Sequence, residues 1–139
     1  GESEHFRNIK RHKVRTHPEI ISIRIDGSLY FANIRFLENA IAKLVSDNQR
    51  CKHFVLMASA VNFIDISALD ALENINFRLQ QSGIKLHLSE VKGPVMDRLE
   101  RSTFLEHLTG KVFLSQSEAF HSIIAELTQK PHPEDSPAE

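Results

Sequence analysis

The sequence predicts an α/β domain with a mixed, mostly parallel sheet, an N-terminal hairpin and packed helices. Segments with the alternation or continuous hydrophobicity of strands take turns with segments that repeat hydrophobic residues at helical spacing. The 139 residues are 41% hydrophobic and 25% charged, which is typical of one soluble domain with a single core. A buried strand leads directly into a helix over residues 54–69, and this stretch organises the rest of the chain.

Residues 1–17 are interpreted as a basic arm or linker that precedes the domain at 18–129. Its basic residues are Arg7, Lys10, Arg11, Lys13 and Arg15. A solvated linker is one interpretation, and a membrane-proximal segment that contacts anionic lipid headgroups is the other. Nucleic acid is not an expected partner, because the net charge is -1 and no basic or aromatic-rich stretch elsewhere in the sequence supports such binding.

The first elements of the domain are predicted to be a hairpin and a helix. Isoleucines alternate with polar residues over 21–26, which predicts a strand, and Asp26-Gly27 predicts a turn. Leu29–Phe31 is predicted to pair with that strand as the second half of a hairpin. Asn33 is predicted to cap a helix that runs to about Asp47, where hydrophobic residues recur at helical spacing.

The middle of the chain is predicted to form a buried strand, a turn and a second helix. Residues from Phe54 to Ala60 are nearly all apolar, as in a strand covered on both faces. The turn spans Asn62 to Asp65, and the following helical stripe is expected to end at Ser82-Gly83.

The remaining elements are expected to complete the sheet and its cover. Alternation over 84–88 predicts a strand, and Gly93-Pro94 predicts the start of a short helix that ends near Arg101. Residues 112–114 are a short strand candidate, and the capping box over 115–118 predicts the start of a last helix that reaches about Leu127. The segment 130–139 is expected to be a disordered tail.

Several kinds of chemistry have no support in the sequence. Nucleotide-binding enzymes usually carry a glycine-rich phosphate loop, whereas the glycines here are isolated. The eight histidines are scattered without ligand spacing, so no metal site is predicted. Ser59 and Ser67 lack a nucleophile-elbow pattern, and Cys51, the single cysteine, is interpreted as incidental to a helix end. We therefore expect a domain that is not an enzyme and has no cofactor.

The candidate contact site is the turn that carries Asn62, Asp65 and Ser67. This turn lies where a parallel strand ends, which is the edge of such a sheet that ligands reach. Asp65 is a natural N-cap, and Ser67 falls in the first helical turn, where the helix dipole favours negative charge. Ser67 is therefore either an ordinary first-turn residue or a phosphoacceptor.

Residues Val61–Leu69 resemble the signature loop of STAS domains, and the resemblance extends over about residues 20–127. STAS domains occur in bacterial anti-sigma-factor antagonists and as the cytosolic C-terminal domain of SulP-type sulfate and anion transporters. Residues 26–33 and 91–104 are similar to segments of the transporter branch. In antagonists the loop reads Asp-Ser-Ser-Gly and its second serine is phosphorylated. Ser67 matches that serine, while Ile66 and Ala68 depart from the flanking positions.

The resemblance implies a non-catalytic regulatory or interaction domain of a SulP-type transporter. Implied partners are the transmembrane portion of the same transporter and cytosolic regulatory proteins, at the cytoplasmic face of a bacterial inner membrane. The chain begins at Gly1 and has no apolar stretch of membrane-spanning length, so we expect a soluble piece excised from a longer protein. The alternative is a free-standing antagonist that phosphorylation of Ser67 regulates. Weak nucleotide binding is implied by the family alone.

Overall fold

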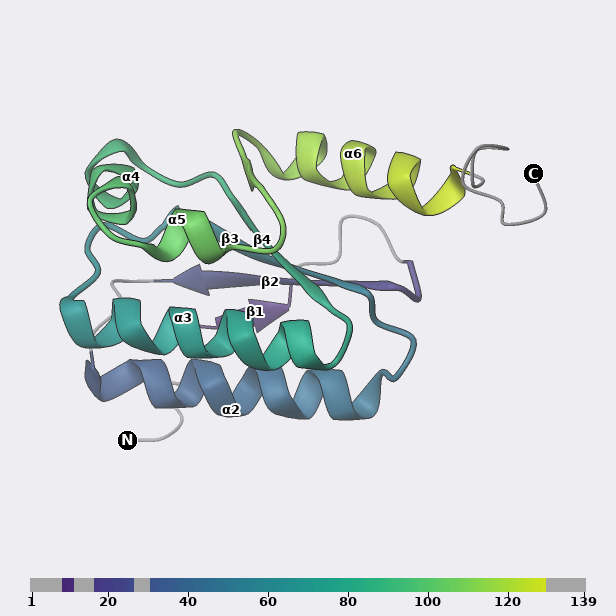
Figure 1. Ribbon diagram of the computed structural model, residues 1–139, viewed down its shortest axis with the longest axis horizontal. Coiled ribbons are helices and arrows are strands. Elements are labelled where there is room, and N and C mark those ends of the chain that lie inside the picture. Colours follow the sequence, from purple (N-terminus) through teal and green to yellow (C-terminus); the bar gives the residue numbers. More distant parts are fainter. Residues whose placement is uncertain (1–8, 12–16, 27–30, 130–139) are drawn as a thin grey trace.

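The computed structural model describes residues 9–11, 17–26 and 31–129, which form a five-stranded sheet with helices on both faces (Figure 1). The elements in chain order are β1 (Ile9–Arg11), β2 (Ile20–Asp26), α2 (Phe31–Asp47), β3 (His53–Ala60), α3 (Ile66–Gln81), β4 (Lys85–Ser89), α4 (Gly93–Glu100), α5 (Phe104–His107), β5 (Val112–Phe113) and α6 (Gln116–Thr128).

The strands lie in the sheet in the order in which they occur along the chain, β1-β2-β3-β4-β5. Strands β2 to β5 are parallel, and β1 is antiparallel to β2. This arrangement confirms the predicted α/β class and the mostly parallel sheet. The carboxyl ends of the four parallel strands therefore meet at one edge of the sheet.

The antiparallel partner of β2 is not the segment that the sequence predicted. Ile9 lies opposite Ile25 in the register, so β1 comes from the basic arm upstream of β2. Phe31, predicted to end a strand, is instead the first residue of α2, and Asn33 lies inside that helix rather than at its N-cap. Leu29 and the turn before it lie outside the described residues. The early start of α2 has a local reason: Phe31 stands three residues before Ile34 and so extends the hydrophobic repeat of the helix by one position.

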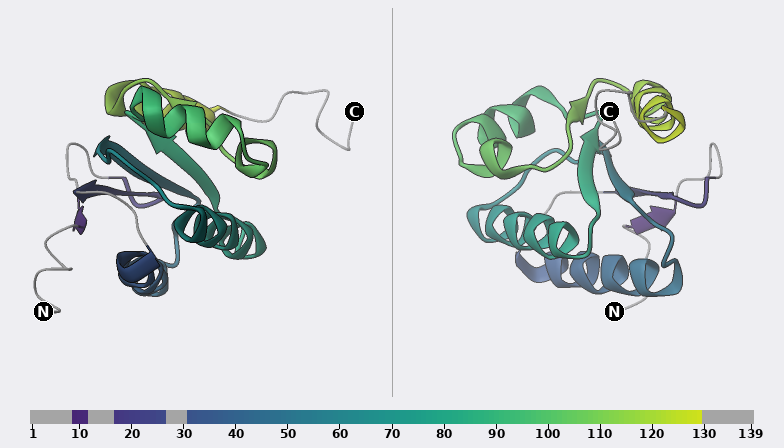
Figure 2. Two further views of the ribbon diagram at one scale, coloured as in Figure 1. Left: turned by 90° about the vertical axis from the view of Figure 1, so that its left-hand side faces the viewer. Right: turned by 45° about the vertical axis from the view of Figure 1, so that its right-hand side comes forward.

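Each face of the sheet buries its own hydrophobic cluster. The larger cluster joins one side of β2, β3 and β4 to α2 and α3, and it includes buried residues of α4 and α5. The smaller cluster joins the opposite side to α6 through Ile20, Val55, Phe113, Phe120 and Ile123. Figures 1 and 2 show α2 and α3 side by side on one side of the strands and α6 on the other.

The helix boundaries follow from local capping chemistry. Helix α3 ends at its C-cap Ser82, and Gly83 then takes a φ of 77°, a left-handed conformation that glycine adopts without strain. Pro94 stands in the first turn of α4, where its missing N–H is no loss. Ser115 caps α6 by accepting the N–H of Glu118 at 3.0 Å. These observations confirm three boundaries predicted from the sequence.

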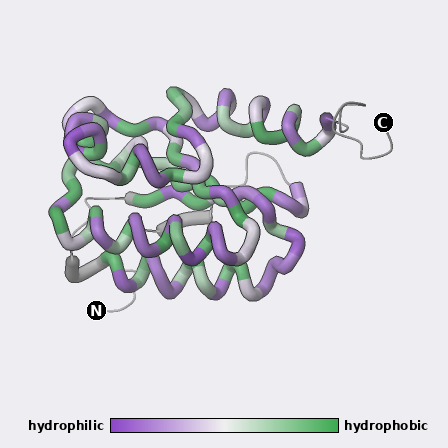
Figure 3. Tube along the Cα trace, in the orientation of Figure 1, coloured by the Kyte–Doolittle hydropathy of each residue, from purple (hydrophilic) through white to green (hydrophobic). Residues whose placement is uncertain are grey.

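Helices α2 and α3 are amphipathic, and each packs its hydrophobic face against the sheet. Their hydrophobic and hydrophilic stretches alternate along the chain trace, as Figure 3 shows. Among the described residues, no helix has both the length and the hydropathy that spanning a bilayer requires.

Candidate functional site

The loop that follows β3 lies at the carboxyl edge of the sheet and is anchored by two buried side chains. Val61 is 0% exposed and Ile64 is 2% exposed, and both belong to the larger hydrophobic cluster. Between and after them, Phe63 is 47% exposed and Ile66 is 65% exposed. The same short loop therefore buries two apolar side chains in the core and exposes two others to solvent.

Asp65 is the N-cap of α3, as the sequence predicted. Its backbone is extended, with φ of -89° and ψ of 172°, and its Oδ1 accepts the backbone N–H of Ala68 at 2.7 Å. Its carbonyl accepts the N–H of Leu69 at 2.9 Å, the first hydrogen bond of the helix. The carboxylate thus satisfies a donor that the helix itself leaves unpaired.

Ser67 is the second residue of α3, and its side chain is exposed. Asn62 is also exposed and stands at the other end of the same loop, where its Oδ1 accepts a hydrogen bond from the Lys92 ammonium at 3.0 Å. This bond joins the loop after β3 to the residue just before α4. The structure therefore places all three predicted contact residues on one loop and helix start.

The basic arm is only partly described. Lys10 and Arg11 are in β1, at the edge of the sheet, where Lys10 lies opposite Arg24 in the register. Arg7, Lys13 and Arg15 lie outside the described residues. The expected contact of this arm with lipid headgroups stays a prediction.

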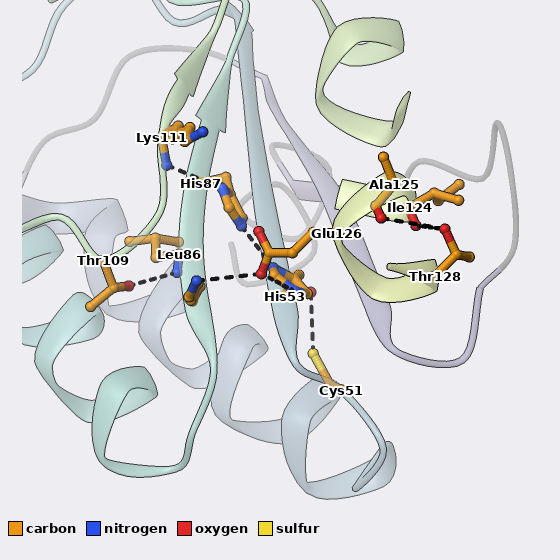
Figure 4. Close-up of polar contacts among 11 residues, drawn as sticks. Cys51, His53, Leu86, His87, Thr109, Lys111, Ile124, Ala125, Glu126 and Thr128 are labelled. Atoms are coloured by element: carbon orange, nitrogen blue, oxygen red, sulfur yellow. Dashed lines mark hydrogen bonds and ion pairs between the residues drawn. The ribbon is translucent and has the colours of Figure 1, made fainter. Parts of the chain in front are cut away.

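A second polar site lies under α6, on the opposite face of the sheet from α2 and α3 (Figure 4). His53 on β3 and His87 on β4 are both 3% exposed, and His53 Nδ1 lies 2.9 Å from His87 Nε2. The backbone N–H of Lys111 donates to His87 Nδ1 at 3.1 Å. On the far side, His53 Nε2 lies 3.6 Å from Oε2 of Glu126 on α6.

These contacts assign the proton of each ring. Because His87 Nδ1 accepts from Lys111, the proton of neutral His87 is on Nε2, which donates to His53 Nδ1. The proton of His53 is then on Nε2 and faces the Glu126 carboxylate. The result is two directed hydrogen bonds, from Lys111 to His87 and from His87 to His53, followed by a polar contact of 3.6 Å between His53 and Glu126 on α6.

Burial keeps both histidines neutral. Burial is the largest cause that lowers the pKa of His87 to about 3, and the neighbouring His53, Lys85 and Lys111 contribute to the same change. The pKa of His53 is also lowered, mainly by burial, although the Glu126 carboxylate opposes that change. Neutral rings are what the donor and acceptor assignment requires.

Sequence reasoning missed this histidine pair, because the histidines were judged one by one along the chain. The signal was the strand alternation, which puts His53 and His87 on the same face of neighbouring strands once the parallel pairing is drawn. In the observed register Val55 lies opposite His87, so the two histidines are diagonal neighbours. Among the described residues, no group of three or more metal-ligating side chains is arranged around an ion site.

Two further polar contacts hold α6 on this face. Gln116, at the start of α6, accepts a hydrogen bond from the Ser89 hydroxyl and donates one to Ser22.

Cys51 lies beside the histidines, and its thiol donates to the His53 carbonyl at 3.3 Å. Burial raises the pKa of this thiol above its ordinary value, although the basic residues Arg50 and Lys52 flank it in the sequence, so Cys51 is not an activated thiolate.

Comparisons with known proteins give consistent results. The family model described as STAS domain matches residues 11–119. Sulfate transporter 3.2 of Arabidopsis thaliana is 31% identical over 128 residues, which are 84% of this chain and 20% of the transporter. Probable sulfate transporter 4.2 of the same plant is 33% identical over 117 residues, which are 76% of this chain and 17% of the transporter. The chain therefore spans about a fifth of the length of these curated relatives.

Solved structures share the fold. The murine anion transporter Slc26a9 superposes with a TM-score of 0.70 at 21% identity, over 80% of this chain and 18% of that protein. The STAS domain of a SulP transporter from Vibrio cholerae gives a TM-score of 0.69 at 21% identity, over 81% of this chain and 87% of that one. The anti-sigma factor antagonist SpoIIAA gives 0.61 at 12% identity, over 84% of this chain and 97% of that one. Since the family model also matches well over half of the residues, the chain belongs to the STAS domain family.

Proposed function

We propose that this chain is the cytosolic regulatory and interaction domain of a SulP-type sulfate or other anion transporter. The observation that carries the proposal is the identity of 31% and 33% to sulfate transporters, over most of this chain and about a fifth of theirs. The antagonist SpoIIAA shares the fold at 12% identity. The transporter branch is therefore favoured over the free-standing antagonists.

In this role the domain makes contacts and catalyses no reaction. Its carboxyl edge presents Phe63 and Ile66 to solvent beside the polar side chains of Asn62 and Ser67, a composition suited to a protein contact. The first partner is the transmembrane portion of the same transporter, and cytosolic regulatory proteins are the second. The proposed location is the cytoplasmic face of a bacterial inner membrane, with the basic arm near anionic headgroups.

The gene that encodes the chain tests this proposal. We expect an open reading frame in which several membrane-spanning segments precede the present residues. An open reading frame that encodes the domain without any such region contradicts the proposal. Sulfate uptake by cells that express the full-length protein, compared with a version that lacks residues 18–129, then measures what the domain contributes. Equal uptake and equal surface expression would argue against a regulatory role.

Phosphorylation of Ser67 is the second candidate, and the exposure of this side chain in the first turn of α3 favours it. A phosphate there would add about -1.5 to -2 charge near the positive end of the helix dipole, with the Asp65 carboxylate opposing it. Incubation with the cognate kinase and ATP, followed by mass spectrometry, tests the idea. Ser67→Ala is the control, and an unmodified Ser67 in the native chain counts against the switch.

Nucleotide binding, which the family alone implies, is tested by calorimetry with GTP and ATP. If neither nucleotide gives a heat of binding, this hypothesis is removed.

A further inference from the structure

A cleft of about 290 Å³ opens between the loop after β3 and helix α4. Asn62, Phe63 and Ile64 line it from the loop, and Pro94, Asp97, Arg98 and Arg101 line it from α4 and its C-cap. The hydrogen bond from Lys92 to Asn62 joins the two walls. Residues 30 positions apart in the sequence thus form one concave surface.

The cleft carries an excess of positive charge. Arg98 and Arg101 stand three residues apart, which places them on one side of the end of α4. Asp97 is the carboxylate among the lining residues, and Lys92 adds a further cation near the opening. Among the described residues, no carboxylate lies within ion-pair distance of either arginine.

Arg98 has a buried hydrogen-bond donor that is not satisfied. Its Nε is buried, and this N–H finds no acceptor among the residues that the structure describes. A buried donor without an acceptor is unfavourable, and such an atom in a folded protein calls for an explanation. An oxyanion that accepts from Nε and Nη together is the natural partner, because the guanidinium fork matches two oxygens of one group.

Three of the residues that line the cleft are apolar, two from the loop and one from α4. Phe63, which is 47% exposed, and Ile64, which is 2% exposed, come from the loop, and Pro94 comes from the start of α4. The volume is near the lower end of the range for small-molecule sites and exceeds what a bare tetrahedral oxyanion fills. A ligand that occupies it combines an oxyanion with a compact apolar body.

We propose that this cleft binds a small organic anion, whose carboxylate or phosphate group pairs with Arg98 and Arg101 while its apolar part rests on Phe63. Because Nε is buried, this pairing requires the Arg98 guanidinium to turn toward the opening, where its Nε–H gains the acceptor that it lacks. Bound there, the anion contacts the loop that leads to Asp65 and Ser67 and thus acts as an effector of the contact edge. This role is separate from the anion path of a transporter.

Amide NMR titration of the 139-residue chain tests the proposal, with phenyl phosphate, benzoate, inorganic phosphate and inorganic sulfate as probes. We expect saturable shifts at residues 62–64 and 97–101, and phenyl phosphate should bind at least about threefold more tightly than inorganic phosphate. Shifts that never saturate, or that lie away from these residues, overturn the proposal. Equal affinity for phenyl phosphate and inorganic phosphate overturns the role of the apolar lining residues.

Variants of Arg98 separate pairing from general attraction. Arg98→Met should weaken binding of phenyl phosphate by about tenfold or more, and Arg98→Lys should weaken it less, because lysine keeps the charge but loses the fork. Arg35→Met is the matched control, since Arg35 is an exposed arginine on α2 and does not line the cleft. Unchanged amide shifts outside the cleft show that the variants are folded. Equal weakening by the variants at 98 and 35 overturns the proposal.

Discussion

Asp65 shows how one side chain fixes the start of the helix that carries the candidate contact edge. Its Oδ1 holds the Ala68 N–H at 2.7 Å. Asp65→Ala should therefore lower the free energy of unfolding by about 1 kcal/mol, within the usual 0.5–2 kcal/mol for a lost cap. Urea denaturation followed by circular dichroism measures the change. Asp65→Asn is the control, because asparagine also caps, and a loss of the same size in both variants would contradict the capping role.

Gly110 lies so close to β4 that adding one methyl group there would clash with His87 of the histidine pair. A Cβ placed on Gly110 would lie 2.2 Å from the Leu86 carbonyl oxygen and 2.4 Å from His87 Nδ1. Gly110→Ala should therefore lower the free energy of unfolding by about 1–3 kcal/mol through overpacking.

Gly93→Ala is the matched control for this change, because a Cβ at Gly93 has nothing within 4 Å. Urea denaturation of both variants measures the difference. If Gly110→Ala loses no more free energy of unfolding than Gly93→Ala, the added methyl group is accommodated at position 110 and the predicted overpacking is contradicted.

At the scale of elements, the histidine pair joins β3, β4 and α6 only while both rings are neutral. In the unfolded chain the histidines take up protons below a pH of about 6.5. The folded chain resists this, because burial lowers the pKa of His87 to about 3. The unfolded state then binds more protons, so the contribution of neutral His87 is complete above about pH 6.5 and is lost as the pH falls toward about 3.

Stability should accordingly fall with acidification, by up to about 1.4 kcal/mol per pH unit for each fully protected histidine. Urea denaturation at pH values from 7.5 to about 5 gives the slope. His87→Gln should reduce the slope, since the amide hydrogen-bonds but does not titrate. His121→Gln is the control, because His121 on α6 is exposed, and a native slope equal to that of His87→Gln would contradict the account.

At the scale of the whole molecule, one sheet shared by two hydrophobic clusters should unfold as a unit. We expect a single urea transition with the same midpoint by far-ultraviolet circular dichroism and by methyl NMR signals. Ile123→Val, in the cluster under α6, should lower both midpoints together, for a loss of about 0.5–1.5 kcal/mol. An early transition confined to the methyl groups of α6 would show that this helix detaches by itself.

Local chemistry predicted much of the fold, and contacts between distant segments explain the rest. Gly83, Pro94 and Ser115 mark boundaries because their own backbone or side chain ends or starts a helix. The strand β1 was not predicted, because an edge strand tolerates charged residues such as Lys10 and so lacks the expected alternation. The contact of His53 with His87 spans 34 residues and depends on the strand register, which no single stretch of sequence contains.

The same limit applies to the candidate site. Asn62, Asp65 and Ser67 were found because the strand, the turn and the cap are consecutive in the sequence. Their neighbours Lys92, Arg98 and Arg101 come from another segment, and only the packing of α4 beside the loop brings them to the edge.

The short strand β1 also bears on the tendency of the chain to aggregate. Three residues of β1 cover the outer side of β2, which is seven residues long. If β1 separates, the free N–H and C=O groups of β2 become a template on which a strand of another chain can add. Strand β1 therefore protects the edge of β2 from self-association, and removing residues 1–16, which include β1, should make the remaining chain prone to aggregate.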